Sequence, residues 1–174
     1  MRSLKGISIA SLKMAMNYAS SEQARVARIE PIKGENIMDL AEAKKIIDAA
    51  HKKADEMNLP MCIAVMDSNA YLIAFVRTGD TTLDSIQIAI DKAYTSALIR
   101  MTTRELGIQC QPGAPLYGIQ NNLNGRLVIF PGGLPLWQNN KLVGAIGVSG
   151  GLVDQDEAVA LGGASLYSTI QNIT

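Results

Sequence analysis

The stretch Phe130–Gly151, FPGGLPLWQNNKLVGAIGVSGG, decides the fold of this chain. Its apolar runs at 134–137 and 141–148 flank Asn139-Asn140, a pair that suits a tight turn. We therefore predict two adjacent antiparallel strands here. Glycine inside a strand weakens the strand, so the many glycines here indicate bulges or places where other backbone approaches closely.

Three further apolar runs predict three more strands. The runs 61–66 and 71–76 flank the polar turn 67–70 and form a hairpin, and 127–130 precedes the glycine-rich stretch. The first two runs are almost continuously apolar, which indicates a sheet buried on both faces. Because the links between neighbouring strands are short, we expect a five-stranded, largely antiparallel sheet flanked by helices, an α/β (α+β) fold.

Helical spacing of apolar residues predicts the helices. The clearest begins after Asp39, which forms a D-x-x-E capping pattern with Glu42, and ends before Asn58. A second long helix is expected over 82–106, with Gly107 as its left-handed stop.

The same capping pattern recurs near the end of the chain. Asp154 and Glu157 open a final helix that is expected to run to about Ile170. An additional amphipathic helix is expected near the N-terminus, followed by a linker that contains proline and glycine. We therefore predict an N-terminal segment, residues 1–36, and a single domain over 37–174.

Composition excludes several classes of function. Sixteen basic and sixteen acidic residues balance to zero net charge, which disfavours nucleic acid as a partner. No apolar run is long enough to span a membrane and no signal peptide is convincing, so the protein is expected to be cytoplasmic. Cys62 and Cys110 match no zinc motif, and Cys62 is expected to be a small core residue.

No catalytic set is readable. Ser149 lies in G-x-S-G-G, which is neither a nucleophile elbow nor a phosphate-binding loop. Asp91 and Lys92 are expected on the solvated face of the second helix, and Asp67 is expected to begin a turn. A small-ligand-binding protein is therefore favoured over an enzyme, with an oligomeric or partner-binding accessory protein and an enzyme of unknown type as alternatives.

The glycine pairs at the strand ends are the strongest binding candidates. Gly132-Gly133 and Gly150-Gly151 could present backbone N–H groups to an anionic ligand. The alternative is that they serve tight turns and helix packing.

Five motifs in order resemble the GlcG/HbpS family (DUF336), and most closely its PduO-type branch. They are I-A-V-M-D (63–67), D-K-A-Y-T-S-A (91–97), Q-P-G-A-P-L-Y-G (111–118), G-G-L-P-L-W (132–137) and G-A-I-G-V-S-G-G-x-x-x-Q-D (144–156). The resemblance covers roughly residues 38–170. It implies a profilin-like domain that assembles into homo-oligomers, up to tetramers or octamers. It does not carry over the corrinoid adenosyltransferase activity, which belongs to a different domain of the fused relatives.

The resemblance also implies a ligand, haem or a corrinoid-related tetrapyrrole, and an accessory role in diol or glycerol utilisation, with microcompartment proteins as partners. The ligand-binding residues that we predict on this basis are His51, Tyr117, Gly132, Gly133, Ser149, Gly150 and Gly151. His51, the only histidine, is the candidate iron ligand, although a half-exposed histidine at a helix edge is the alternative. Tyr, Met or Cys could ligate iron instead. The relatives are richer in histidine near the positions of Arg104 and Asn122, which cannot ligate iron here.

Overall fold

The computed structural model describes Lys13, residues 38–169 and Gln171. The chain divides into two units, 1–34 and 35–174, and the description below concerns the second. The predicted N-terminal helix and its linker lie outside the described residues, so the predicted boundary at residue 36 stays a prediction.

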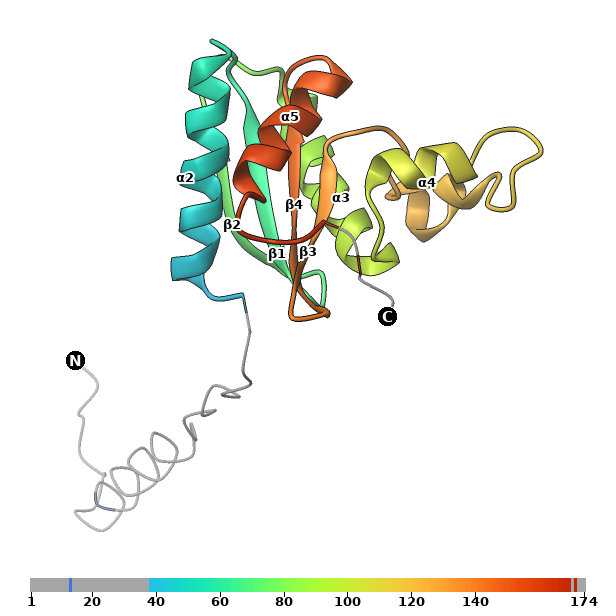
Figure 1. Cartoon of the computed structure of the whole chain (residues 1–174), viewed down its shortest axis with the longest axis horizontal. Coiled ribbons are helices and arrows are strands. Elements are labelled where there is room, and N and C mark those ends of the chain that lie inside the picture. Colours follow the sequence, from blue (N-terminus) through green and yellow to red (C-terminus); the bar gives the residue numbers. More distant parts are fainter. Residues whose placement is uncertain (1–12, 14–37, 170, 172–174) are drawn as a thin grey trace, which may run out of the picture. The chain divides into compact units, whose positions relative to one another are not determined.

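A four-stranded antiparallel sheet forms the centre of the domain (Figure 1). Its strands are β1 (Cys62–Asp67), β2 (Leu72–Arg77), β3 (Gly133–Gln138) and β4 (Lys141–Ser149), in the order β2-β1-β4-β3. The predicted β3–β4 hairpin is confirmed, because Asn139 and Asn140 both adopt positive φ in its turn. Asp67 begins the β1–β2 turn as predicted, since its Oδ1 accepts hydrogen bonds from the N–H groups of two turn residues.

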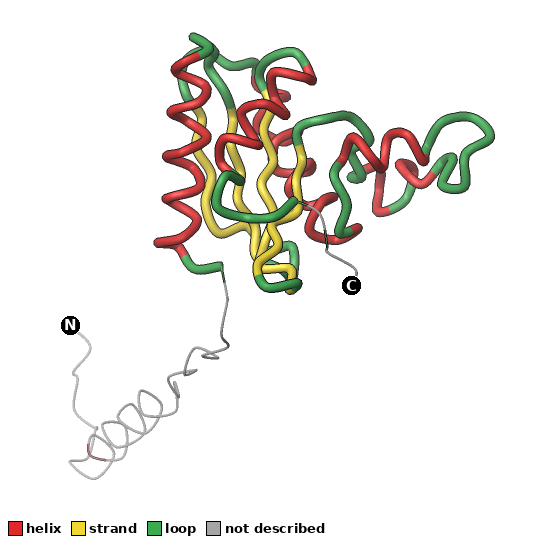
Figure 2. The backbone as a smooth tube through the Cα atoms, viewed as in Figure 1, coloured by secondary structure: helices red, strands yellow, loops and turns green. Residues whose placement is uncertain are grey.

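Helices cover both faces of this sheet (Figure 2), as the unbroken apolar runs predict. On one face, α2 (Leu40–Glu56) and α5 (Val153–Gly163) pack on the larger core, which contains Ile63 and Val65 of β1. On the other face, α3 (Leu83–Ile99) packs on Cys62, Ala64 and Met66 of β1. The alternation along β1 follows from the two-residue period of a strand.

Two glycines let the helices approach closely. A Cβ at Gly147 of β4 would lie 2.1 Å from the carbonyl oxygen of Ala89 in α3. A Cβ at Gly163 of α5 would lie 3.0 Å from the Cβ of Ala50 in α2. These two glycines therefore serve helix packing.

The predicted fifth strand is not observed. Residues 127–130 have no strand conformation, and the N–H of Val128 donates to Oγ1 of Thr95 in α3 at 3.0 Å. A side chain of the helix thus takes the hydrogen bond that a neighbouring strand would have provided. The carbonyl oxygen of Ile129 would also lie only 2.2 Å from a Cβ at Gly107, so this segment packs closely on α4.

The predicted helix over 82–106 is two helices. Arg100 adopts φ 62°, ψ 34° and ends α3, and α4 (Thr103–Gln109) begins three residues later. Thr102 and Glu105 form a capping box that satisfies the new N-terminus. Gly107 lies within α4 and does not act as the stop.

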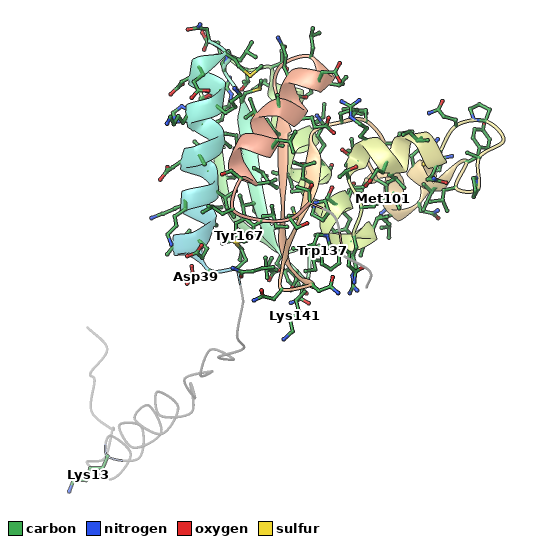
Figure 3. All side chains as sticks on the ribbon, viewed as in Figure 1. Lys13, Asp39, Met101, Trp137, Lys141 and Tyr167 are labelled. Atoms are coloured by element: carbon green, nitrogen blue, oxygen red, sulfur yellow. The ribbon has the colours of Figure 1, made fainter. Side chains whose placement is uncertain are left out.

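The final helix is shorter than predicted. It ends at Gly163, and the following segment runs across the same face of the sheet toward β3. The hydroxyl of Tyr167 donates to Glu42 of α2 at 3.2 Å, and Ser168 exchanges backbone hydrogen bonds with Trp137 of β3 (Figure 3). The helix does not continue here because these bonds hold the segment between α2 and β3.

Residues 102–130 form a side lobe that projects from the α3 side of the domain (Figure 1). It contains α4 and two short 3-10 turns, Ile119–Asn121 and Leu123–Gly125. Arg104 of α4 pairs with Asp154 at 2.5 Å and with Glu157 at 2.7 Å, and so joins the lobe to the start of α5. The carboxyl groups predicted as a helix cap therefore bind an arginine.

Candidate functional site

A pocket of about 550 Å³ opens where the β1–β2 turn meets α3 and the base of the side lobe. Its wall combines apolar and aromatic side chains with one guanidinium and contains Met66, Tyr71, Leu72, Ile90, Tyr94 and Arg126, among others. Met66 and Leu72 come from the two strands of the first hairpin, and Ile90 and Tyr94 lie one turn apart on α3. This volume lies within the range of small-molecule sites.

Among the described residues that line this pocket, Arg126 is the one with a basic side chain. Its guanidinium lies 3.8 Å from the ring centroid of Tyr94, and its Nε donates to Oδ1 of Asp91 at 2.6 Å. Gln87 donates to the other oxygen of Asp91 at 3.0 Å. These contacts hold Arg126 against the ring, and its remaining N–H groups can bind a carboxylate.

Asp91 therefore is not the solvated residue that helix periodicity predicted. Its side chain is only 14% exposed and it positions Arg126 at the pocket. The sequence signal was the D-K-A-Y-T-S-A motif, but the partner lies 35 residues away and is brought to α3 by the side lobe.

The second correction concerns Lys92, which is completely buried. Its Nζ donates to Oδ2 of Asp156 at 2.7 Å and to the carbonyl oxygen of Val148 at 2.8 Å, and it lies 5.0 Å from the ring centroid of Phe130. Lys92 thus joins α3 to the end of β4 and to α5. The prediction of a solvated lysine is wrong because its side of α3 faces the glycine-rich strand end.

Burial sets the protonation equilibria of this pair. Burial lowers the pKa of Lys92, against the attraction and hydrogen bond of Asp156. Burial likewise raises the pKa of Asp156, against the opposing effects of Lys92 and of the N–H groups of Gly151 and Gly150. Each charge depends on the other for its compensation.

The glycine pairs have internal partners. Gly151 donates its N–H to Oδ1 of Asp156 at 2.9 Å, and Gly133 donates to Oγ1 of Thr103 at 2.9 Å. The anionic group that Gly151 binds is thus a carboxylate of the chain itself. A Cβ at Gly132 would lie 2.7 Å from Nζ of Lys92, so this glycine makes room for the buried ion pair. Ser149 is 5% exposed at the end of β4.

The other two predicted site residues lie away from these glycines. His51 is on α2, with its side chain 44% exposed and its Nε2 3.5 Å from Oδ1 of Asp55. Tyr117 is 65% exposed in the side lobe, on the opposite flank of the domain from α2 (Figure 1). The structure therefore brings Gly132, Gly133, Ser149, Gly150 and Gly151 together, and His51 and Tyr117 do not join them.

Sequence reasoning missed the pocket residues Tyr94 and Arg126. Tyr94 stood in a motif that we used only for family resemblance, and Arg126 lies in a loop without periodicity. Within the described part of the chain, none of the helices has the length and apolarity to cross a bilayer, and no three His, Cys, Asp or Glu side chains gather as metal ligands. Both cysteines are buried and unpaired, and the burial of Cys62 was expected.

Comparison with known proteins confirms the family. The sequence model "Haem degrading protein HbpS-like" matches residues 38–165. The "uncharacterized 15.0 kDa protein in dhaT-dhaS intergenic region" of Citrobacter freundii is 44% identical over 121 residues, which are 70% of this chain and 85% of that protein. Corrinoid adenosyltransferase PduO of the same organism is 34% identical over 148 residues, 85% of this chain, but the match spans only 43% of PduO.

A solved structure supports the same assignment. The PduOC:Heme complex superposes with a TM-score of 0.74 at 30% identity, over 79% of this chain and 99% of that one. The match over most of the described domain, in sequence and in fold, leads to one conclusion: this chain belongs to the HbpS-like family and is similar to its PduO-type members.

Proposed function

We propose that this protein binds haem or a related tetrapyrrole in the pocket between the β1–β2 turn, α3 and the side lobe. The observation that carries the proposal is the composition of that pocket, about 550 Å³ lined by apolar side chains, two tyrosines, a methionine and Arg126. The similarity to the PduOC:Heme complex supports this ligand class.

The residues of the pocket fit such a ligand. Phenol and thioether groups can both ligate haem iron in proteins, and Tyr94 and Met66 are the pocket residues that would hold the group in this way. The apolar surface of Ile90 and Leu72 suits a flat macrocycle, and the Arg126 guanidinium suits its carboxylates. Bound haem would supply redox and ligand-binding chemistry. Tyr94 and Arg126 would hold it, and Asp91 would keep Arg126 in place.

Haem titration of the purified protein tests the proposal. We expect a saturable Soret band, and Tyr94→Phe, which removes only the phenol oxygen, should change its position and weaken affinity about tenfold or more. Absence of saturable binding to the unaltered protein would refute the proposal.

The same titration tests His51, which stays the iron ligand predicted from the sequence. His51→Ala is the matched variant on the other face of the sheet, and under our proposal its spectrum equals that of the unaltered protein. A changed spectrum in His51→Ala together with an unchanged one in Tyr94→Phe would move the site to α2.

The proposal includes the wider setting implied by the family. We propose a homo-oligomeric accessory protein of diol or glycerol utilisation, in the cytoplasm and in association with a microcompartment. The similarity to PduO and to the dhaT-dhaS intergenic protein supports this setting. Deletion of residues 1–36 tests the part played by the N-terminal segment, and unchanged assembly and localisation would remove that segment from the proposal.

A further inference from the structure

Strand β2 is an outer strand of the sheet, since it pairs with β1 alone among the described strands. The opposite outer strand, β3, is partly covered, because Trp137 bridges to Ser168. The residues of β2 between its ends are only half-buried, although all of them are apolar. An outer strand of this composition requires explanation, because unprotected edges promote pairing with other chains.

The backbone groups that β2 turns outward can be assigned. Thr78 donates its N–H to the carbonyl oxygen of Met61 at 2.9 Å, which makes these two a hydrogen-bonded pair. Such pairs alternate along an antiparallel ladder, so Val76 and Ala74 bond to β1 while the N–H and C=O of Phe75 point away from it. No backbone hydrogen bond joins Phe75 to any other described residue on that side.

Charge and proline, two of the usual protections of a sheet edge, are absent from most of this strand, which has one bulge opposite Val65 and Met66 and ends at the charged Arg77. Residues 70–76, AYLIAFV, include no charged residue and no proline. Tyr71 is 71% exposed and Leu72 is 46% exposed, and both also line the pocket. The open edge of the sheet and the open side of the pocket are therefore continuous.

We propose that β2 pairs in antiparallel fashion with β2 of a second copy of this chain, which extends the sheet across a twofold axis and narrows the open side of the pocket. The outward groups of a strand edge are self-complementary under such an axis. Zero net charge removes long-range repulsion between copies. Pairing centred on Phe75 separates the two Arg77 residues by about 14 Å along the strands and sets each opposite Ile73.

This inference deepens the proposed function by adding a second copy to its site, yet its test needs no haem. Light scattering on the haem-free protein should give at least the molar mass of a dimer. Leu72→Lys places a charge on the edge and should at least halve the molar mass. Leu161→Lys is the matched control on α5, where leucine is 50% exposed, and Tyr94→Phe is the control within the pocket. Both controls should keep the mass of the unaltered protein.

Residue-resolved amide exchange on the unaltered protein gives a second test that does not depend on any variant folding. The amide of Ala74 bonds to β1 and should exchange slowly at every concentration. The exchange rate of the Phe75 amide should be lower, by roughly tenfold or more, in the assembled protein than at dilutions where monomers dominate. A Phe75 amide that exchanges fast in the assembly overturns the proposal.

The two proposals fail in different ways. A monomer, or an assembly that Leu72→Lys leaves intact in a folded protein, contradicts the pairing of β2 but not haem binding. A Phe75 amide protected in a monomer means that another part of the same chain covers the edge, and this also contradicts pairing between copies. A dimer that gives no Soret band contradicts only the proposed function.

Discussion

Replacement of Lys92 by methionine tests the main structural claim, that a buried ion pair ties α3 to α5 behind the glycine-rich strand end. Lys92 is fully buried, and its ammonium compensates the carboxylate of Asp156 at 2.7 Å. Methionine fills nearly the same volume but leaves Asp156 without that charge. Loss of one partner of a buried pair costs about 3–5 kcal/mol. For a domain of this size that lowers the melting temperature by roughly 6–20 °C.

Urea and thermal denaturation at pH 7 measure this cost, and Lys53→Met is the matched control. Lys53 pairs with Glu56 on α2 at 3.2 Å with its side chain 42% exposed, so its replacement should change the free energy of unfolding by less than about 1 kcal/mol. Equal losses in the two variants would refute the reasoning, since they would show that the buried charges do not depend on each other.

The cost of Lys92→Met should also depend on pH. The pKa of Asp156 is already raised from its ordinary value of 3.8 by burial, and loss of Lys92 removes the main opposing effect. The folded variant then binds a proton more tightly than its unfolded chain does. Its stability relative to the unaltered protein is therefore highest below pH 3.8 and declines as the pH rises through the folded-state pKa. Adding Asp156→Asn, which retains an oxygen for Gly151, should restore part of the stability at pH 7.

Three further substitutions have defined outcomes. Gly147→Ala should cost at least about 2 kcal/mol in urea denaturation, because the new Cβ would lie 2.1 Å from the carbonyl oxygen of Ala89, and a neutral effect would mean that α3 can shift. Arg100→Gly should raise stability by about 1 kcal/mol, as it relieves a left-handed residue, and a lower melting temperature would contradict this. Asp67→Ala should cost about 1 kcal/mol through the two turn N–H groups that it satisfies, and an unchanged unfolding curve would show that water replaces it.

Local patterns predicted the elements whose signals are local. The hairpin turn at Asn139-Asn140 and the N-terminus of α2 at Asp39 follow from side chains within four residues of each other. The division between α3 and α4 was also readable, because T-x-x-E at Thr102 and Glu105 is a capping box. The prediction of one helix failed because periodicity continued across Arg100 while the backbone turned.

The errors in the site have a different origin. Periodicity along α3 cannot tell which elements cover each side of a helix, so Lys92 was expected in solvent and is buried against Asp156, 64 residues away. The strand predicted at 127–130 failed for a related reason, because Thr95 of α3 takes the hydrogen bond of Val128. In both cases the partner is remote in sequence.

The glycine-rich stretch shows both sides of this division. By itself the sequence determined the antiparallel hairpin, the close packing at its glycines and the family, because turn chemistry, strand period and ordered motifs are all carried by neighbouring residues. Only the tertiary structure decided that Gly151 binds the chain's own Asp156, that Lys92 is its counter-ion, and that the pocket lies beside Tyr94 and Arg126. The physical reason is that burial and charge compensation depend on contacts between segments that are distant in sequence, and a local sequence pattern does not determine those contacts.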